Sequence, residues 1–298
     1  MLMKIHKKKR PNIVLLFYIL PAFIFYFIIE IIPAAGSLFY SLTDWNGLTH
    51  QYQIIGISNY FEALTEDSNF VNSLLFTLKY ALFIVVLQNL IALMLAAFIE
   101  SRRKGRVFFR TVYFMPNMIS MIIAGYMWMF IFTRVLPQIA EFLPALGFLD
   151  QSWIGDPNFS FPAILIVSLW GGVGYQMIIY IAAIQGVPQQ LKEAAIIDGA
   201  TNVQIFWRVT LPMIMPALTI GIFLALNSSI KVFDVIFVLT GGGPGWKTQP
   251  ISLNIFEEAF KMNNRYGYAC AKAVILFLIV CVITVIQLSV MKKKEVDL

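Results

Sequence analysis

The sequence is poor in the residues from which most active sites are built. It has two histidines and two cysteines, and charged residues make up only 13% of its 298 positions. Two cysteines, Cys270 and Cys281, are too few for a disulfide framework. His6 and His50 are too far apart in the chain to form a paired metal-ligand motif. The sequence therefore predicts neither a metal site nor an enzyme, although a membrane-embedded enzyme or scaffold stays open as an alternative.

A nucleotide site is also excluded. The glycine run 241–245 is followed by Lys247 and Thr248, as in a phosphate-binding loop. Such a loop needs Gly immediately before the Lys, so that backbone amides can surround the phosphates. Trp246 occupies that place. We expect no cofactor in this chain, which cannot hydrolyse ATP by itself.

Apolar residues dominate what is present, at 59% of the chain. A membrane-spanning helix needs about 20 consecutive, mostly apolar residues. Six segments satisfy this requirement: 12–32, 74–99, 112–132, 161–184, 213–239 and 269–291. The sequence predicts an all-α integral membrane protein, with residues 1–298 in a single transmembrane domain. The net charge of +6 belongs to the loops between spans and does not indicate binding to nucleic acid.

The basic residues are distributed unevenly among these loops. Segment 33–70 contains none. The others gather at the two termini and in alternate loops: Lys4, Lys7, Lys8, Lys9, Arg10, Arg102, Arg103, Lys104, Arg106, Arg110, Lys192, Arg208, Lys292, Lys293 and Lys294. Because lysine and arginine favour the cytoplasmic side of a membrane, we expect both termini and the loop between spans four and five to be cytoplasmic.

That loop, residues 187–216, reads as a helix–turn–helix. Pro188 suits the first turn of a helix, and Gly199 can adopt the left-handed conformation that ends one. Thr201 and Gln204 have the spacing of a capping box, which opens a second helix. This second helix is expected to stop near Leu211, because Pro212 disfavours helical geometry in the residue before it. An alternative is an amphipathic loop that lies on lipid headgroups.

The loop contains, in this order, Glu193, Ala194, Ala195, Asp198, Gly199, Ala200, Phe206, Val209, Leu211, Pro212 and Pro216. Their order and spacing resemble the EAA signature of ABC-importer permeases. Phe233-Asp234 with 239–244, and Asn59-Tyr60-Phe61, are similar to the carbohydrate-uptake, maltose-type permeases of that family.

The resemblance implies a protein of the bacterial cell membrane with several partners. These would be a second permease, two ATPase subunits that bind ATP and Mg²⁺, and an extracytoplasmic solute-binding protein that delivers a sugar. Glu193, Ala194 and Ala195 would dock on an ATPase, and Gly199 would turn the second helix back. The mechanism implied is alternating access.

Polar and aromatic side chains interrupt the apolar spans. They include Gln88, Asn117, Tyr175, Gln176, Tyr180, Asn227 and Ser228. Amides, hydroxyls and aromatic faces are the groups that recognise sugars, so spans four and five are the predicted path. Gln176 and Tyr180 share a helix face, and Gly171, Gly172 and Gly174 are expected to loosen span four and let a neighbour approach. The alternative is that these polar groups only join helices to one another.

Lys231 and Asp234 are three residues apart in span five and are expected to form an ion pair with a structural or gating role. A different interpretation makes them the coupling element of a stand-alone, ion-driven secondary transporter.

Overall fold

The structure, a computed structural model, describes residues 13–102, 104–262 and 264–292. Six helical stretches in this part of the chain are long and apolar enough to cross a membrane. The predicted all-α fold with six spans is confirmed. Several of the basic residues used to predict the topology lie outside the described part, namely Lys4, Lys7, Lys8, Lys9, Arg10, Arg103, Lys293 and Lys294, as does His6.

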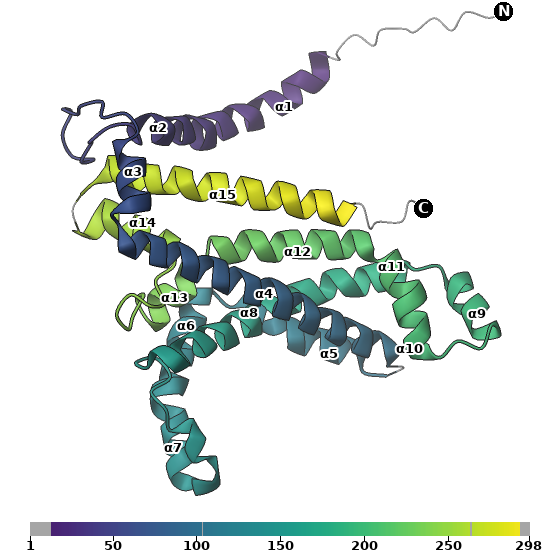
Figure 1. Cartoon of the computed structure of the whole chain (residues 1–298). Coiled ribbons are helices and arrows are strands. Elements are labelled where there is room, and N and C mark those ends of the chain that lie inside the picture. The colour runs from purple at the N-terminus through teal and green to yellow at the C-terminus, as the bar shows by residue number, and fades with distance from the viewer. Residues whose placement is uncertain (1–12, 103, 263, 293–298) are drawn as a thin grey trace, which may run out of the picture.

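Four long helices form the centre of the molecule. They are α4 (Ser68–Ser101), α8 (Pro157–Gly186), α12 (Met215–Ile230) and α15 (Tyr266–Lys292), which run side by side (Figure 1). α4 packs against α8 and α12, and α15 packs against α12. The buried residues Ala92 and Ala96 of α4 lie in one apolar cluster with Met177 and Tyr180 of α8. Small side chains of this kind let helices in a membrane approach closely.

α4 and α8 begin earlier than the predicted spans, each directly after an aspartate that caps it. The Asp67 side chain accepts a hydrogen bond from the Phe70 amide, and the Asp156 side chain accepts one from the Asn158 amide. Each bond satisfies an amide that the first turn of a helix leaves free. Gly171, Gly172 and Gly174 do not loosen α8, which is unbroken. Their predicted second role, the close approach of a neighbour, is confirmed, because a Cβ on Gly174 would lie 2.9 Å from Phe114 Cα.

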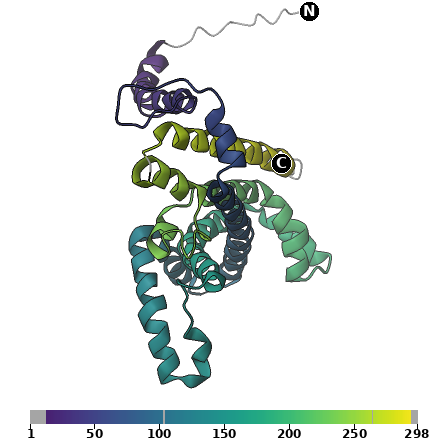
Figure 2. The same ribbon diagram turned by 60° about the vertical axis from the view of Figure 1, so that its left-hand side comes forward.

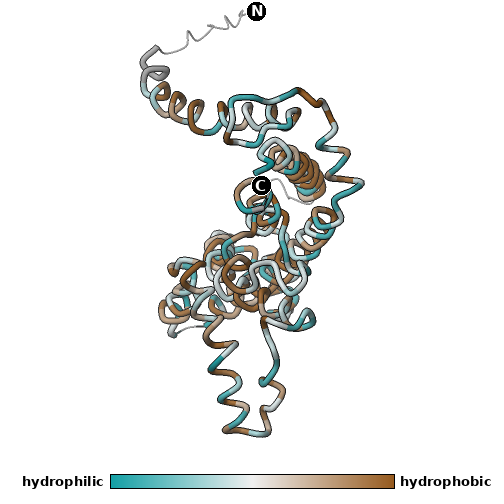
Figure 3. Tube along the Cα trace, turned by 90° about the vertical axis from the view of Figure 1, so that its left-hand side faces the viewer, coloured by the Kyte–Doolittle hydropathy of each residue, from teal (hydrophilic) through white to brown (hydrophobic). Residues whose placement is uncertain are grey.

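Span one continues beyond the predicted end at residue 32. α1 (Ile13–Tyr26), the π-helical turn η1 (Phe27–Ile31) and α2 (Ile32–Tyr40) form one rod. Pro33 lacks an amide hydrogen, and the wider turn that precedes it absorbs the missing bond. α2 lies against α15, whereas α1 diverges from the bundle (Figure 1). The coloured turns of α1 and η1 are mostly apolar (Figure 3).

The prediction for span three, 112–132, is wrong in its start and its continuity. The chain forms α5 (Arg106–Phe114), the 3₁₀ turn η2 (Met115–Met118) and then α6 (Met121–Phe130), with extended backbone at Ile119 and Ser120 between them. Pro116 prevents one regular helix here. η3 (Ile131–Val135), α7 (Leu136–Phe142) and η4 (Pro144–Leu149) follow. They occupy much of the predicted loop 133–160 and form an arm that projects from the bundle (Figures 1 and 2).

Span five, predicted as 213–239, is interrupted. α12 ends at Ile230, and α13 (Asp234–Leu239) begins after a break at Lys231–Phe233. The chain then turns through the glycine run into α14 (Ile251–Glu257) and η6 (Glu258–Met262). Another short helix, α3 (Ser58–Thr65), lies between spans one and two. We call the end of the bundle that carries α3 and α14 the α14 end.

Candidate functional site

The opposite end of the bundle carries two short helices, α9 (Gln189–Ile197) and α10 (Asn202–Ile205). They project from the bundle beyond α12 (Figures 1 and 2). Gly199, at φ 79°, ends α9 in a left-handed turn. The Gly199 amide donates to Ile196 O at 3.0 Å and the Ala200 amide to Ala195 O at 2.9 Å. This is the Schellman arrangement, which satisfies the last carbonyls of a helix.

A capping box opens the second helix of the pair. The Gln204 amide donates to Thr201 Oγ1, and the Thr201 amide donates to Gln204 Oε1 at 2.8 Å. The second helix continues through the π-helical turn η5 (Phe206–Thr210) into α11 (Leu211–Met213) and ends there, two residues beyond the predicted stop near Leu211. The predicted reason for the stop is wrong, because Leu211 is itself helical and the wider turn tolerates the missing amide hydrogen of Pro212.

The surface of this helix pair is largely uncovered. Glu193, Ala194, Asp198 and Gly199 are exposed; Ala195, Ala200, Phe206 and Pro212 are half-buried. Sequence reasoning missed the exposed apolar side chains beside them, which are Leu191, Ile196, Ile197, Val203 and Trp207. Ile197 is 85% exposed and Trp207 61%. These side chains lie on α9, α10 and η5. A group of exposed apolar side chains of this kind is typical of a surface that another molecule covers.

A cleft of about 440 Å³, lined by both polar and apolar residues, lies between α4, α8, η2 and the α12–α13 break. Five of the predicted path residues line it: Gln88, Asn117, Tyr175, Gln176 and Ser228. Tyr80, Ser168 and Ser229 also line it and were not predicted as path residues. Asn227 does not line the cleft. A polar residue within an apolar run was the available signal for Tyr80 and Ser168, and they share a hydrogen bond of 2.8 Å.

Tyr180 lies behind the cleft wall in a buried hydrogen-bonded cluster that we call the amide knot (Gln88, Asn89, Gln176, Tyr180). Gln176 donates to Asn89 Oδ1 at 2.7 Å and to the Tyr180 hydroxyl at 3.0 Å, which confirms that Gln176 and Tyr180 share a face. Tyr180 donates to Asn89 Oδ1, and Gln88 donates to Gln176 Oε1 at 3.2 Å. The knot joins α4 to α8, so for Gln176 and Tyr180 the helix-joining interpretation holds.

Lys231 and Asp234 both line the cleft and both are exposed to it. No ion pair joins them among the described residues, so the predicted pairing is wrong. The helix breaks between them, and Phe233 has non-helical angles of φ −139° and ψ −62°. Ser252 of α14 donates a hydrogen bond to the free carbonyl of Val232 at this break. The cleft therefore contains one cation and one carboxylate, both available to a ligand.

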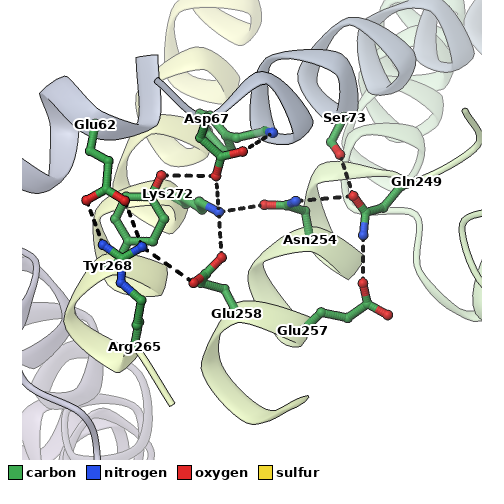
Figure 4. A network of polar contacts seen from close by, with 11 residues as sticks. Glu62, Asp67, Ser73, Gln249, Asn254, Glu257, Glu258, Arg265, Tyr268 and Lys272 are labelled. Carbon is green, nitrogen blue, oxygen red and sulfur yellow. Dashed lines mark hydrogen bonds and ion pairs between the residues drawn. The ribbon is translucent and has the colours of Figure 1, made fainter. Parts of the chain in front are cut away.

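A network of polar side chains around Lys272, which we call the Lys272 cluster, connects the elements of the α14 end (Figure 4). Lys272 of α15 is fully buried, and its Nζ lies 2.7 Å from Asp67 Oδ2 and 3.0 Å from Glu258 Oε2. It also donates to Asn254 Oδ1 at 3.0 Å. Arg265 binds both oxygens of Glu62 at 2.7 and 2.6 Å. The cluster joins α3, α4, α14, η6 and α15, and sequence reasoning missed it.

Two charged groups of this cluster, Asp67 and Arg265, have shifted pKa values. Burial alone would raise the pKa of Asp67, but hydrogen bonds from Lys272 and the Phe70 amide outweigh burial and hold that pKa below its ordinary value. The hydrogen bonds from Arg265 to Glu62 raise the pKa of the Arg265 guanidinium. Both groups stay charged at neutral pH.

Comparison with known proteins decides the family. Residues 88–294 match the family described as binding-protein-dependent transport system inner membrane component. The chain belongs to this family. It is a multi-pass inner-membrane permease of the ABC-transporter type, and as a transporter subunit it is not an enzyme.

Relatives match the permease over nearly its whole length. It is similar to a probable starch degradation products transport system permease protein, AmyD, of Thermoanaerobacterium thermosulfurigenes, with 40% identity over 94% of each chain. It is also similar to the multiple sugar-binding transport system permease protein MsmF of Streptococcus mutans, with 36% identity over 93% of each. The trehalose/maltose transport system permease protein MalF of Thermococcus litoralis shares 30% identity over 91% of each.

A solved structure has the same fold. The permease matches a chain of a bacterial ABC transporter involved in the import of the acidic polysaccharide alginate, with a TM-score of 0.83, 22% identity and coverage of 95% and 96%. Among the described residues, no group of three or more His, Cys, Asp or Glu side chains could hold a metal ion.

Proposed function

We propose that the permease imports a sugar or oligosaccharide. The observation that carries this proposal is the cleft, where amides, hydroxyls and the half-exposed ring of Tyr175 surround one cation and one carboxylate. Such a lining offers donors, acceptors and an apolar ring face to a polyhydroxyl ligand. Lys231 and Asp234 balance in charge, which suits a neutral sugar. Relatives named for starch degradation products and for multiple sugars support the same class of cargo.

The permease works with partners in this proposal. A second permease completes the translocation path, two ATPase subunits bind ATP and Mg²⁺, and a solute-binding protein delivers the sugar at the α14 end. The membership of the family in binding-protein-dependent systems supports this assembly and sets aside the ion-coupled alternative. Both termini and the α9–α10 pair are cytoplasmic, and α1 begins on that side.

The α9–α10 pair is the proposed docking element for an ATPase. Glu193 meets a basic group of the ATPase, and Ala194 and Ala195 permit close packing. The exposed rings and methyls of Ile197 and Trp207 supply apolar contact area. The Schellman turn and the capping box hold the two helices at a fixed angle, so a movement of the ATPase passes into η5, α11 and α12.

Uptake in liposomes tests the cargo. The purified complex, with its solute-binding protein outside and ATP inside, is given labelled maltotriose, with alginate oligosaccharide and glycerol 3-phosphate as anionic competitors. We expect Tyr175→Ala to lower maltotriose uptake at least fivefold. Tyr126→Ala, which removes a 60% exposed ring outside the cleft, is the matched control and should leave uptake unchanged. Equal uptake by both variants, or transport of the anions alone, would refute the sugar path.

A second experiment tests the docking element. Glu193→Ala and Gly199→Pro should abolish sugar-dependent ATP hydrolysis while leaving membrane insertion intact. Gln190→Ala, an exposed change on the same helix, is the control and should behave as wild type. Wild-type uptake in Glu193→Ala and Gly199→Pro would remove the α9–α10 pair from the coupling mechanism.

A further inference from the structure

The exposed face of α4 carries a basic side chain towards each of its ends. α4 runs from the α14 end of the bundle to the end that carries the α9–α10 pair (Figure 1). Lys79 lies towards the first end, and Arg102 is the C-cap residue at the second. Both side chains are exposed and lie over aromatic rings, at 4.3 Å from the centroid of Phe161 for Lys79 and 4.4 Å from that of Phe98 for Arg102. Neither forms an ion pair with a described residue.

The separation of these two cations matches the thickness of a membrane. Arg102 follows Lys79 by 23 residues, which is about 35 Å of helix. A hydrocarbon core is about 30 Å thick, and a bilayer with its headgroups is about 40–45 Å thick. The two cations therefore lie at the headgroup levels on opposite sides of the membrane. The exposed side chains of α4 that follow Lys79, up to residue 98, are all apolar: Leu82, Phe83, Val86, Leu90, Met94 and Phe98.

Other cations gather at the second of these two ends. Lys104 and Arg106 are exposed close to Arg102 in the chain, and Arg110 is half-buried. Glu100 is the one carboxylate of this segment, and Arg110 already binds it at 2.5 Å. Four described cations and one carboxylate leave a charge of +3 here. An anion is therefore attracted to this end of α4.

α5 begins at the same place and adds its N-terminus. No side chain caps α5 at Gly105, and its first turn contains no acidic residue. The free amides of a first turn and the positive end of the helix dipole attract anions. Arg106 is held beside them, because its guanidinium donates to backbone carbonyl oxygens at the end of α4. Val107 and Phe108 on this turn are exposed and apolar. Cations and free amides thus lie next to an apolar surface.

We propose that this end of α4 binds an anionic phospholipid. Its phosphate binds at Arg102, Lys104 and the first amides of α5. One acyl chain packs along Leu90, Met94 and Phe98, which share a helix face because they are four residues apart. From Leu90 to Arg102 is twelve residues, or about 18 Å. One leaflet contributes half of a core of about 30 Å, so this length fits an acyl chain and the step to its phosphate.

Photolabelling tests this site. The complete complex is reconstituted in phosphatidylcholine vesicles that contain a trace of phosphatidylglycerol with a photoactivatable diazirine in its acyl chain. Labelled peptides are identified by mass spectrometry, and we expect label on residues 90–98. Each basic residue near a membrane surface strengthens the attraction of anionic lipid about fivefold. Arg102→Gln combined with Lys104→Gln should therefore lower the labelling of 90–98 at least tenfold. Both side chains are exposed, so the fold should be unaffected.

Lys79→Gln is the matched control, because Lys79 is the only charged residue of segment 68–99 and lies towards the other end of the same face. It should leave the labelling of 90–98 unchanged. The same diazirine chain on phosphatidylcholine, whose headgroup carries a compensating cation, should label 90–98 at least tenfold less than on phosphatidylglycerol.

Two results would overturn the inference. Equal labelling by the two lipids, or of wild type and the double variant, would show a lipid surface without preference for a headgroup. Absence of label from 90–98 with both lipids would show that another protein chain covers this face. Neither result affects the proposed cargo, which the uptake experiment tests separately.

Discussion

Replacing Lys272 by methionine should destabilise the α14 end far more than replacing Lys261. Lys272 is 0% exposed, and the carboxylates that it pairs with, Asp67 and Glu258, are 19% and 14% exposed. Removing one member of a buried ion pair costs about 3–5 kcal/mol, because the other charge is left buried without a partner. The two carboxylates here retain some contact with water, so we expect about 3 kcal/mol, at the low end of that range.

Lys261 provides a matched control on a neighbouring element. Its Nζ lies 3.3 Å from Glu257 Oε1, but its side chain is 52% exposed. Exposed ion pairs contribute about 0–1 kcal/mol. Each kcal/mol shifts the unfolding temperature of a domain of this size by about 2–4 °C. Lys272→Met should therefore lower the midpoint by about 6–12 °C, and Lys261→Met by less than about 4 °C.

The measurement is thermal unfolding of the purified complex in detergent, followed by intrinsic fluorescence. A variant that combines Lys272→Met with Asp67→Asn and Glu258→Gln should recover most of the lost stability, because the uncompensated charges are gone. The reasoning from buried charge is refuted if Lys272→Met and Lys261→Met unfold at the same temperature. It is also refuted if the combined variant unfolds at a lower temperature than Lys272→Met alone.

Three further predictions concern the amide knot, the packing of α12 and the pKa of Asp67. Tyr180→Phe removes a hydroxyl from the amide knot and should lower stability by about 1–3 kcal/mol in thermal unfolding. Tyr175→Phe should change sugar uptake only. Equal unfolding temperatures for the two variants would contradict a stabilising role of the amide knot. Gly221→Ala should destabilise the protein by about 1–3 kcal/mol. α12 packs tightly at this position, and the new Cβ would collide with Gln176 and Tyr180. Wild-type stability of the variant would show that α12 can move away. Because the pKa of Asp67 is lowered in the folded state, its ionised carboxylate stabilises the fold at pH values above its ordinary pKa of 3.8, and this stabilisation is lost as the pH falls through the lowered pKa. Unfolding midpoints measured from pH 5 downward should therefore fall more steeply for wild type than for Asp67→Asn. Parallel curves would contradict this.

The sequence predicts much of the fold because the membrane makes local pattern decisive. A backbone in lipid must satisfy its own hydrogen bonds, so an apolar run of sufficient length becomes a helix. The turn at Gly199 and the capping box of Thr201 and Gln204 are local as well, and both form as predicted. Helix bounds are predicted less well near prolines. Span one was expected to end at residue 32, before Pro33, and the helix after Thr201 near Leu211, before Pro212; in the structure each helix continues past its proline after a π-helical turn.

The cleft was predicted only in part, since it depends on contacts between distant segments. Tyr175 and Gln176 were found because polar groups in apolar spans stand out. The break at Lys231–Phe233 was missed because the apolar pattern continues across it, and its stabilising contact comes from Ser252 on another helix. The Lys272 cluster could not be read from the sequence, because Tyr268 and Asp67, which share a hydrogen bond, are 201 residues apart.

Affinity purification of the tagged permease from native membranes tests the central claim most directly. In mild detergent the wild-type chain should recover an ATPase and a second six-span permease, identified by mass spectrometry. Ala195→Trp, which makes the half-buried small patch of α9 bulky, should lose the ATPase but keep the second permease. Recovery of the ATPase by both proteins would contradict docking at the α9–α10 pair, and transport of sugar by the chain alone in liposomes without ATP would contradict the account as a whole.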